Sequence, residues 1–414
     1  MSTAPLAAPF RGERYASLGD PSARIAPPYD VLTPQARARL AAEDPHNIVH
    51  LMLPEAPPGE DRYARAAALL AEWRQAGVLA RDTTAAVYVL AQEFALPSGE
   101  RRSRIGMFAA VAAEPYETGR VRPHERTHAG PKADRLALLR ATATNLESIF
   151  LVAPDRDRRL ETAVSGVAKR TPDVRAEQDG VRMRLWVVTG EAARDLALSV
   201  SAGPLYIADG HHRYETAVAY AAGRPGADRV LAFIVSASDP GLAILATHRI
   251  IARGAQEVAP LLATWRAWFD VGRVAPCADR MERLRALGRD GTACLVALPD
   301  GGDLSLALKA NAPLDRVAGL GRTPAVRALD VARVEALVVR ALAGESGMST
   351  LTYTPDPYAV FDAVRHGGAA AAVLLNPPTV EQVFAVADAQ DVMPPKSTYF
   401  VPKVPSGLVL LPLA

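Results

Sequence analysis

The stretch from Leu205 to Ala222, LYIADGHHRYETAVAYAA, constrains the fold more than any other part of this chain. Its first four residues are apolar and typical of a short buried strand, and Asp209 and Gly210 predict a turn. The run from Tyr214 to Ala222 has helical spacing and is rich in alanine, which is a strong helix former. The sequence therefore predicts a strand that turns directly into a helix.

Polar side chains gather at this predicted corner. Backbone N–H groups at the start of a helix have no partner within the helix, so they attract anions. Arg213 adds a donor suited to phosphate or carboxylate. We predict Asp209, His211 and His212 as catalytic residues, and Gly210 and Arg213 as phosphate-binding residues. The alternative is that Asp209 caps the helix and that the histidines are ordinary first-turn residues.

A second polar concentration, VRPHERTHAGPKADR, runs from Val121 to Arg135. It contains the pattern H-E-x-x-H from His124 to His128, which binds zinc when it lies on a helix. The flanking Pro123 and Gly130-Pro131 predict a loop instead, and a third ligand is not evident. The flanking residues therefore disfavour zinc proteolysis, and a polar loop is the preferred interpretation.

As a loop, this segment would deliver polar groups to the corner. We predict Glu125 as a base or metal-binding carboxylate, followed by a helix over Arg135–Leu146. Asp30, in the run IAPPYDV, is a further candidate carboxylate or else a turn residue. Four side chains of the loop are predicted to contact substrate or phosphate: His124, Thr127, Lys132 and Arg135.

Lysine is rare in this chain, with five lysines among 47 basic residues. A lysine retained in such a background indicates that a compact ammonium group was needed there. Lys132, Lys396 and Lys403 all lie in polar stretches marked by proline or glycine. The C-terminal loop DVMPPKSTYFVPK is therefore predicted to supply Lys396 and Ser397 as phosphate contacts. The alternative is a proline-stiffened tail packed on the surface.

Predicted strands and helices alternate through the chain, as in an α/β or α+β protein with mixed sheets flanked by helices. A helix is expected over Asp61–Ala76, and the turn Pro97–Gly99 predicts a hairpin of two strands. A strand is expected over Ile48–Leu53, which would direct His46 and His50 away from metal-ligand geometry.

Two parts of the chain are expected to form one site. Residues 1–254 carry the HERTH loop and the ADGHHR turn, and residues 255–414 carry the MPPKST loop, which would close the same site. His248 and Arg249 follow an apolar run and are predicted to face the site. Such polar groups at an apolar strand end are costly unless an anion or solvent is close, although His248 could simply terminate the strand.

Composition excludes several classes of function. The formal net charge of +2 gives no argument for nucleic acid or an anionic membrane as partner. The only cysteines, Cys277 and Cys294, exclude a disulfide scaffold and a multi-cysteine metal site. No stretch approaches the ~20 apolar residues of a membrane span, and the start lacks a signal-peptide pattern. We expect a cytoplasmic protein without a membrane partner.

The segments PPYDV, HERTHAGPKADR, ADGHHRYETA, THR and MPPKSTYF, with VPK and GL, resemble the prokaryotic domain-of-unknown-function family ten-fifteen. The resemblance covers nearly the whole chain. In that family the second histidine of the loop is commonly apolar, so His128 is a departure that further weakens the zinc hypothesis. The association of family members with serine-biosynthesis genes implies a role in serine metabolism.

ADGHHR is also similar to the D-G-H-x-R box of free-serine kinases in the ParB/sulfiredoxin superfamily. This similarity implies a ParB/sulfiredoxin-like element in which Gly210, His211 and Arg213 hold a nucleotide phosphate while carboxylates activate a hydroxyl group. Asp209 and Glu125 would then be the acid/base candidates. Lys132, Arg135, Lys396 and Ser397 would be secondary phosphate contacts.

The expected function is phosphoryl transfer or phosphoester hydrolysis on a small polar metabolite, such as serine or phosphoserine, with a nucleotide partner. The enzyme would be a phosphotransferase or phosphatase. The sequence contains no Walker-type loop to hold the phosphates of a nucleotide, so Mg²⁺ bound through Asp209, Glu125 and Asp30 is a further possibility. One alternative is a ParB-like, nucleotide-responsive DNA-binding regulator, although the near-neutral charge and the lack of a basic helix disfavour it. A non-catalytic small-ligand sensor is the other alternative.

Overall fold

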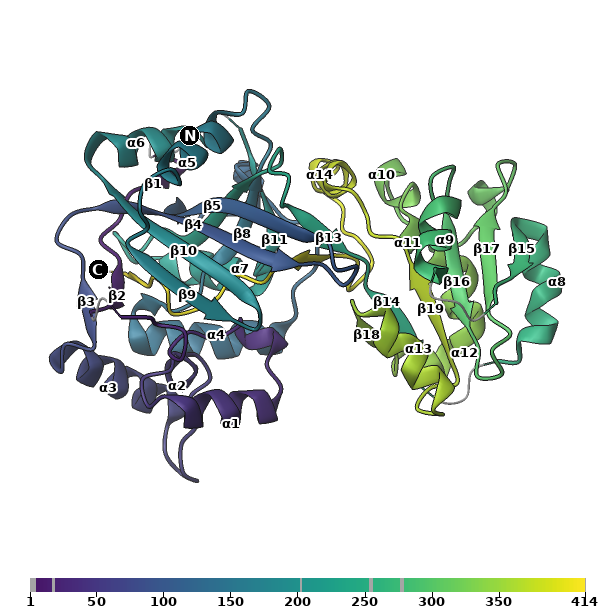
Figure 1. The fold of residues 1–414 in the computed structure, drawn as a ribbon, viewed down its shortest axis with the longest axis horizontal. Helices are drawn as coiled ribbons and strands as arrows, with labels where there is room; N and C mark the ends of the chain where they lie inside the picture. The colour runs from purple at the N-terminus through teal and green to yellow at the C-terminus, as the bar shows by residue number, and fades with distance from the viewer. Residues whose placement is uncertain (1–4, 17–18, 202, 253–255, 276–278, 414) are drawn as a thin grey trace. The chain divides into compact units, whose positions relative to one another are not determined.

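The computed structural model describes residues 5–16, 19–201, 203–252, 256–275 and 279–413. The chain forms two compact units (Figure 1). The first unit runs to Ala243 and resumes at Pro402, and the second comprises Ile244–Val401. The boundary expected between residues 254 and 255 falls outside the described residues. The return of the C-terminal segment to the first unit was not predicted.

A nine-stranded mixed sheet forms the first unit, in the order β6-β11-β8-β12-β5-β4-β10-β9, with β1 beside β5. The expected hairpin is confirmed as the antiparallel pair β4–β5, whereas β6–β11 and β8–β12 are parallel. The strands of this sheet are β1 (Ala7–Ala8), β4 (Ala86–Ala95), β5 (Arg101–Ala112), β6 (Val121–Arg122), β8 (Ile149–Ala153), β9 (Val174–Gln178), β10 (Val181–Thr189), β11 (Leu205–Asp209) and β12 (Arg229–Ser236).

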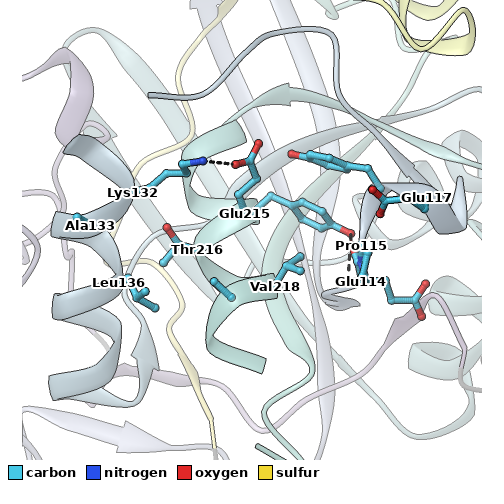
Figure 2. Close-up of a pocket in the computed structure, with 12 residues that line it drawn as sticks. Glu114, Pro115, Glu117, Lys132, Ala133, Leu136, Glu215, Thr216 and Val218 are labelled. Carbon is cyan, nitrogen blue, oxygen red and sulfur yellow. Dashed lines mark hydrogen bonds and ion pairs between the residues drawn. The ribbon is translucent and has the colours of Figure 1, made fainter. Parts of the chain in front are cut away.

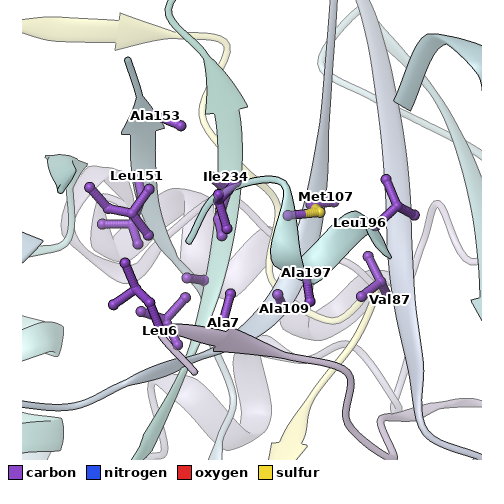
Figure 3. Packing of buried hydrophobic residues seen from close by; sticks show 14 of the residues in the cluster. Leu6, Ala7, Val87, Met107, Ala109, Leu151, Ala153, Leu196, Ala197 and Ile234 are labelled. Atoms are coloured by element: carbon purple, nitrogen blue, oxygen red, sulfur yellow. The ribbon is translucent and has the colours of Figure 1, made fainter. Parts of the chain in front are cut away.

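Helices α5 (Arg159–Val167) and α6 (Gly190–Leu198) pack on this sheet. Their apolar residues join strand residues in one buried cluster, in which Leu196 is 3% exposed and Met107 is fully buried. Figure 3 shows side chains of α6 beside those of the neighbouring strands. Because each fully buried aliphatic side chain contributes about 1.5–3 kcal/mol, this cluster holds the sheet and helices together.

The expected strand–turn–helix is confirmed. Strand β11 ends at Asp209, and helix α7 (His211–Ala221) begins two residues later. Gly210 joins them with φ at 90°, a left-handed conformation that glycine adopts without steric cost. A Cβ atom at Gly210 would lie 3.1 Å from the Arg213 guanidinium and from Ile149. The corner therefore requires glycine.

A helical layer formed by residues of the N-terminal part packs beside α4 (Ala129–Thr142). The strand expected over Ile48–Leu53 is wrong, because this run contains helix α2 (Val49–Met52). The Asn47 side chain accepts from the backbone N–H of Val49, and Val49, Leu51 and Met52 are all buried, without the alternation of a strand. The other elements here are η1 (Tyr29–Val31), α1 (Pro34–Glu43), α3 (Arg62–Gln75), and the pairs β2 (Glu13–Tyr15) with β3 (Leu79–Arg81) and β7 (Thr144–Asn145) with β21 (Leu411–Pro412).

The HERTH segment is a loop, as expected. It follows β6 and the short helix η2 (Tyr116–Thr118), and helix α4 begins at Ala129 with Pro131 in its first turn. The expected start at Arg135 was therefore wrong, because proline is tolerated in the first turn, where its missing N–H leaves no bond unmade. Helix α4 ends at Thr142, before Ala143 in the left-handed conformation.

The second unit contains a six-stranded sheet in the order β15-β17-β16-β19-β14-β18, and the pair β13–β20. Its strands are β13 (Ala243–Leu245), β14 (His248–Ile251), β15 (Phe269–Arg273), β16 (Ala293–Ala297), β17 (Leu304–Leu308), β18 (Thr352–Thr354), β19 (Ala371–Leu375) and β20 (Tyr399–Val401). Its helical elements are α8 (Val258–Trp268), α9 (Arg280–Leu287), η3 (Leu314–Arg316), α10 (Pro324–Arg327), α11 (Asp330–Val334), the π-helical turn η4 (Glu335–Val339), α12 (Arg340–Met348), α13 (Pro357–Arg365) and α14 (Val380–Asp388).

Mixed sheets flanked by helices in both units confirm the predicted α/β or α+β class. No helix in the described part of the chain combines the length and hydropathy needed to cross a bilayer.

Candidate functional site

Asp209 lies at the end of β11 and binds two cations. Its Oδ2 accepts from Arg213 Nη2 at 2.6 Å, and its Oδ1 accepts from Lys403 Nζ at 2.6 Å. Arg213 also donates to the backbone carbonyl of Ser148, the residue before β8. Residues far apart in the sequence thus meet at the start of α7.

These contacts fix the charge of Asp209. Burial alone would raise its pKa, but the charges of Lys403 and Arg213 outweigh burial and hold the pKa well below its ordinary value. Burial alone would lower the pKa of Arg213, but Asp209, Glu147 and Asp30 raise it above its ordinary value. Asp209 is therefore a permanent carboxylate near neutral pH and a poor proton acceptor.

The start of α7 has the donors of an anion site. Its N-cap residue is Gly210, which has no side chain to cap the N–H groups of the first turn. Arg213 has an exposed fraction of 9%, and its Nε has no hydrogen-bond partner among the described residues. A buried guanidinium N–H without an acceptor is costly, so an anion or water at this point would stabilise it.

Two histidine pairs connect the HERTH loop to α7. The Nε2 of His211 accepts from the backbone N–H of His124 at 3.4 Å, with ring centroids 4.7 Å apart. The Nε2 of His212 accepts from the backbone N–H of His128 at 2.8 Å, with the rings stacked 5.9 Å apart. The loop therefore contacts both histidines of the DGHHR motif through its backbone.

The buried imidazoles are held neutral. Burial lowers the pKa of His124 to about 4, and burial with the nearby His124 lowers the pKa of His211 well below its ordinary value. The pKa of His212 is also lowered, by burial and by His128. In a neutral imidazole that accepts at Nε2, the proton lies on Nδ1. His211 and His212 therefore act here as neutral groups.

The loop is also attached to α7 through Glu215. The Glu215 carboxylate accepts from Thr127 Oγ1 at 2.7 Å and from Lys132 Nζ at 2.8 Å. Glu125, the predicted base, lies half-buried in the same loop. Thr127 and Lys132 thus adjoin the corner, and their polar groups contact a carboxylate.

Arg135 lies behind the corner, with an exposed fraction of 6%. It donates to Asp134, to Glu147 at 3.4 Å and to the Met52 carbonyl at 2.7 Å, and its guanidinium lies 4.3 Å from the Tyr29 ring. These contacts favour a role in positioning the PPYDV segment.

Asp30 follows Tyr29 in that segment and is exposed. Its negative charge acts on both His212 and Arg213, where it raises the pKa of each group against the effect of burial. The carboxylate of Asp30 therefore belongs to the surroundings of the corner.

Four predicted contacts lie in the second unit. His248 Nδ1 accepts from the Leu375 backbone N–H at 3.3 Å, and buried Arg249 donates to Thr247 and lies 3.7 Å from Glu335. Ser397 Oγ donates to the Pro394 carbonyl at 2.5 Å, and Lys396 is exposed with φ at 54°. Their participation in the site around Asp209 stays a prediction.

Mg²⁺ ligation by Asp209, Glu125 and Asp30 also stays a prediction. In the described ranges, no three His, Cys, Asp or Glu side chains are grouped in a way that could hold a metal ion. Both oxygens of Asp209 are engaged by cations, so a metal ion there would have to displace Lys403 or Arg213.

The sequence profile of the family described as "Protein of unknown function (DUF1015)" matches residues 7–332. The chain belongs to this family. A search of curated proteins found no match.

Among solved structures, this DUF1015 member is similar to a free serine kinase in complex with AMP, with 13% identity, a TM-score of 0.35, and coverage of 72% of this chain and 87% of that chain. It is similar to SbnI with a C-terminal truncation from Staphylococcus aureus, with 12% identity, a TM-score of 0.38, and coverage of 72% and 84%. A conserved hypothetical protein from Pyrococcus furiosus has 14% identity, a TM-score of 0.34, and coverage of 73% and 93%.

Sequence reasoning missed three charged residues of the site in this DUF1015 member. Lys403 was noted as a retained lysine but was not assigned to Asp209, because its partner lies 194 positions earlier. Glu147 lies between two predicted elements and gave no signal. Glu215 follows His211 by four residues, and this helical spacing could have placed both on one face of α7.

Proposed function

We propose that this protein performs phosphoryl transfer or phosphoester hydrolysis on a small polar metabolite. The observation that carries the proposal is the start of α7, where Gly210 forms no side-chain cap, Arg213 Nε lacks a partner among the described residues and Lys403 lies close by. Backbone N–H groups and a guanidinium at one point suit the oxygens of a phosphoryl group.

In this proposal Arg213, Lys403 and the first turn of α7 neutralise the charge on the phosphoryl oxygens. Gly210 leaves room for a phosphate beside the Arg213 guanidinium, because a Cβ atom at residue 210 would lie 3.1 Å from that group and fill the space. Asp209 is a positioning residue, since it orients both cations and stays ionised. Catalysis would come from positioning and charge neutralisation.

The reaction itself requires a proton acceptor. The oxygen of a hydroxyl group or water attacks phosphorus, one P–O bond forms, and the bond to the leaving oxygen breaks. The proton of the attacking O–H group would pass to Glu125 or Asp30, which are half-buried and exposed carboxylates near the corner. His211 and His212, held neutral, would donate hydrogen bonds from Nδ1 to the reacting groups.

The substrate assignment follows the resemblance of the sequence motifs, which favours serine or phosphoserine with a nucleotide partner. Lys132 and Thr127 on the loop adjoin the corner and are proposed as further contacts. The predicted contributions of Arg135, His248, Arg249, Lys396 and Ser397 remain part of the proposal.

Purified protein should be tested for phosphate release and phosphotransfer with serine, phosphoserine, ADP and ATP, each with and without Mg²⁺. We expect turnover in at least one combination, and a decrease of at least about 100-fold for Glu125→Gln or Asp30→Asn if that carboxylate is the base. The exposed Glu191→Gln on α6 is the matched control. A lack of turnover across the panel would refute the enzymatic proposal.

A non-catalytic sensor is the second candidate, favoured by one observation. Both oxygens of Asp209 are engaged by cations, and the buried histidines stay neutral, so the corner is better equipped to bind a phosphate than to move a proton. Saturable binding of phosphoserine or ADP without turnover in the wild-type protein would favour the sensor.

A further inference from the structure

A cavity of about 540 Å³ lies in the first unit between η2, α4 and α7 (Figure 2). Its walls include the apolar side chains of Leu136 and Val218, which Figure 2 shows below Lys132 and Glu215. A cavity of this volume is large enough for a small organic ligand.

The charged groups lining the cavity are mainly acidic: three carboxylates, of Glu114, Glu117 and Glu215, face one ammonium, of Lys132. Arg120, which does not line the cavity, pairs with Glu114, so these five groups together have a formal charge of −1. An anion such as phosphate would be repelled from this cavity, and a cation would be attracted. The cavity therefore differs in charge preference from the start of α7.

Two stacked tyrosines form one wall. The rings of Tyr116 and Tyr214 lie 5.4 Å apart with an angle of 19° between their planes. The buried Tyr214 donates its hydroxyl hydrogen to the Glu114 carbonyl at 2.8 Å, which fixes the residue that bears the carboxylate. Tyr116 is the more exposed ring of the pair. A tyrosine ring face attracts an ammonium or guanidinium group.

Three buried oxygen atoms at the cavity have unmet hydrogen-bonding capacity among the described residues, and one of them is the Tyr116 hydroxyl oxygen. Glu114 Oε1 accepts from Arg120 at 2.8 Å, whereas Oε2 is buried and has no hydrogen-bond partner in the described part of the chain. The Oγ1 of Thr216, a residue with an exposed fraction of 4%, is also buried without such a partner. A buried carboxylate oxygen without a donor is costly, and the N–H groups of an amine would satisfy it.

The cavity adjoins the start of α7. Glu215 lines the cavity and follows His211 by four residues, which corresponds to about 6 Å along the helix axis. Thr127 contacts Glu215, and the next residue, His128, contacts His212. A ligand that spans about one helical turn could reach both places.

We propose that this cavity binds the amine group of a ligand with a small apolar body, with the ammonium between the Tyr116 ring and the Glu114 and Glu117 carboxylates. The extension to substrate class rests on the proposed function: the substrate would be a phosphorylated amine, with its phosphate at the start of α7 and its ammonium in the cavity.

The test uses three probes of similar shape and no phosphate: 2-phenylethylamine, neutral 2-phenylethanol and anionic 3-phenylpropanoate. Calorimetric titration of the full-length protein should give at least about tenfold tighter binding for the amine than for the alcohol, and no binding of the carboxylate. Glu114→Gln, which keeps the shape of the side chain, should weaken amine binding at least about fivefold. The exposed Glu191→Gln on α6 should leave it unchanged.

Equal binding of amine and alcohol would overturn the proposal, because the cavity would then select only apolar surface. Absence of amine binding, or binding that Glu114→Gln leaves unchanged, would also overturn it. Titration with inorganic phosphate separates this result from the proposed function. Amine binding without phosphate binding would refute the phosphate site and leave the cation cavity standing, whereas phosphate binding without amine selectivity would refute the cavity alone.

Discussion

Replacing Lys403 by methionine tests the central contact of the site. The substitution keeps the apolar stem and removes the ammonium that lies 2.6 Å from Asp209 Oδ1. The side chains of Lys403 and Asp209 are each 16% exposed, so the ion pair is largely buried away from water. Asp209 would then be left with Arg213 as its one remaining cation among these contacts.

The expected loss follows from this geometry. Removing one partner of a fully buried ion pair costs about 3–5 kcal/mol, because the remaining charge is uncompensated. Since Arg213 still pairs with Asp209, we expect a smaller decrease in the free energy of unfolding, of about 2–3 kcal/mol at pH 7.

The effect should also depend on pH. The pKa of Asp209 lies below its value in the unfolded chain, about 3.9, so the stabilisation is present in full above about pH 4. It is lost as the pH falls further, through the folded-state pKa. The difference between wild type and Lys403→Met should be equal at pH 7 and pH 5 and smaller at pH 3.5.

Urea unfolding followed by circular dichroism measures these differences. A double-mutant cycle with Asp209→Asn should give a coupling energy of about 2 kcal/mol at pH 7. Lys169→Met, at an exposed lysine of the same unit, is the control and should change the stability by less than about 0.5 kcal/mol. Additive effects of Lys403→Met and Asp209→Asn would refute the assignment.

Three further predictions concern the corner. Gly210→Ala should lower the free energy of unfolding by about 2–3 kcal/mol, because alanine is strained at this φ and its Cβ would contact Arg213. The control Gly59→Ala, at φ of 91° with open space around it, should lower the free energy of unfolding by about 1 kcal/mol. Equal thermal shifts of the two variants would contradict the steric argument. Acidification from pH 7.5 to pH 5 should lower the free energy of unfolding by about 2 kcal/mol through His124. The pKa of His124 is about 4 in the folded protein and about 6.5 in the unfolded chain. The stabilisation from neutral His124 is therefore present above pH 6.5 and is lost as the pH falls towards 4. His124→Gln should remove this part of the loss in urea unfolding, and an unchanged pH dependence would argue against it. Asp30→Asn should lower the pKa of His212 further, because the negative charge of Asp30 raises that pKa. NMR titration of the His212 ring would detect the shift, and an unchanged titration curve would place Asp30 away from the corner.

The local parts of the fold could be predicted because local chemistry determines them. The apolar run before Asp209, the glycine at the turn and the alanine-rich run after it indicated β11 to within one residue and α7 to within three. Ile48–Leu53 was misassigned because a short apolar run fits either a buried strand or a buried helix, and the Asn47 contact with Val49 decides between them.

The non-local parts of the site could not be predicted from one sequence. Single residues carry no sign of which distant residue they meet, so the pairing of Lys403 with Asp209 and the position of Glu147 behind the corner needed the fold. The cavity beside α7 combines Tyr116, Lys132 and Glu215 from three separate elements, none of which forms a motif alone.

The return of the chain to the first unit has a consequence for its synthesis. Arg104, which is fully buried, donates to the Pro402 carbonyl, and Asp209 binds Lys403. The ribosome makes these late residues only after the whole second unit. A nascent chain that stops before Pro402 would therefore carry an arginine and an aspartate without these partners, and the corner around Asp209 would be completed only after the whole second unit has been made.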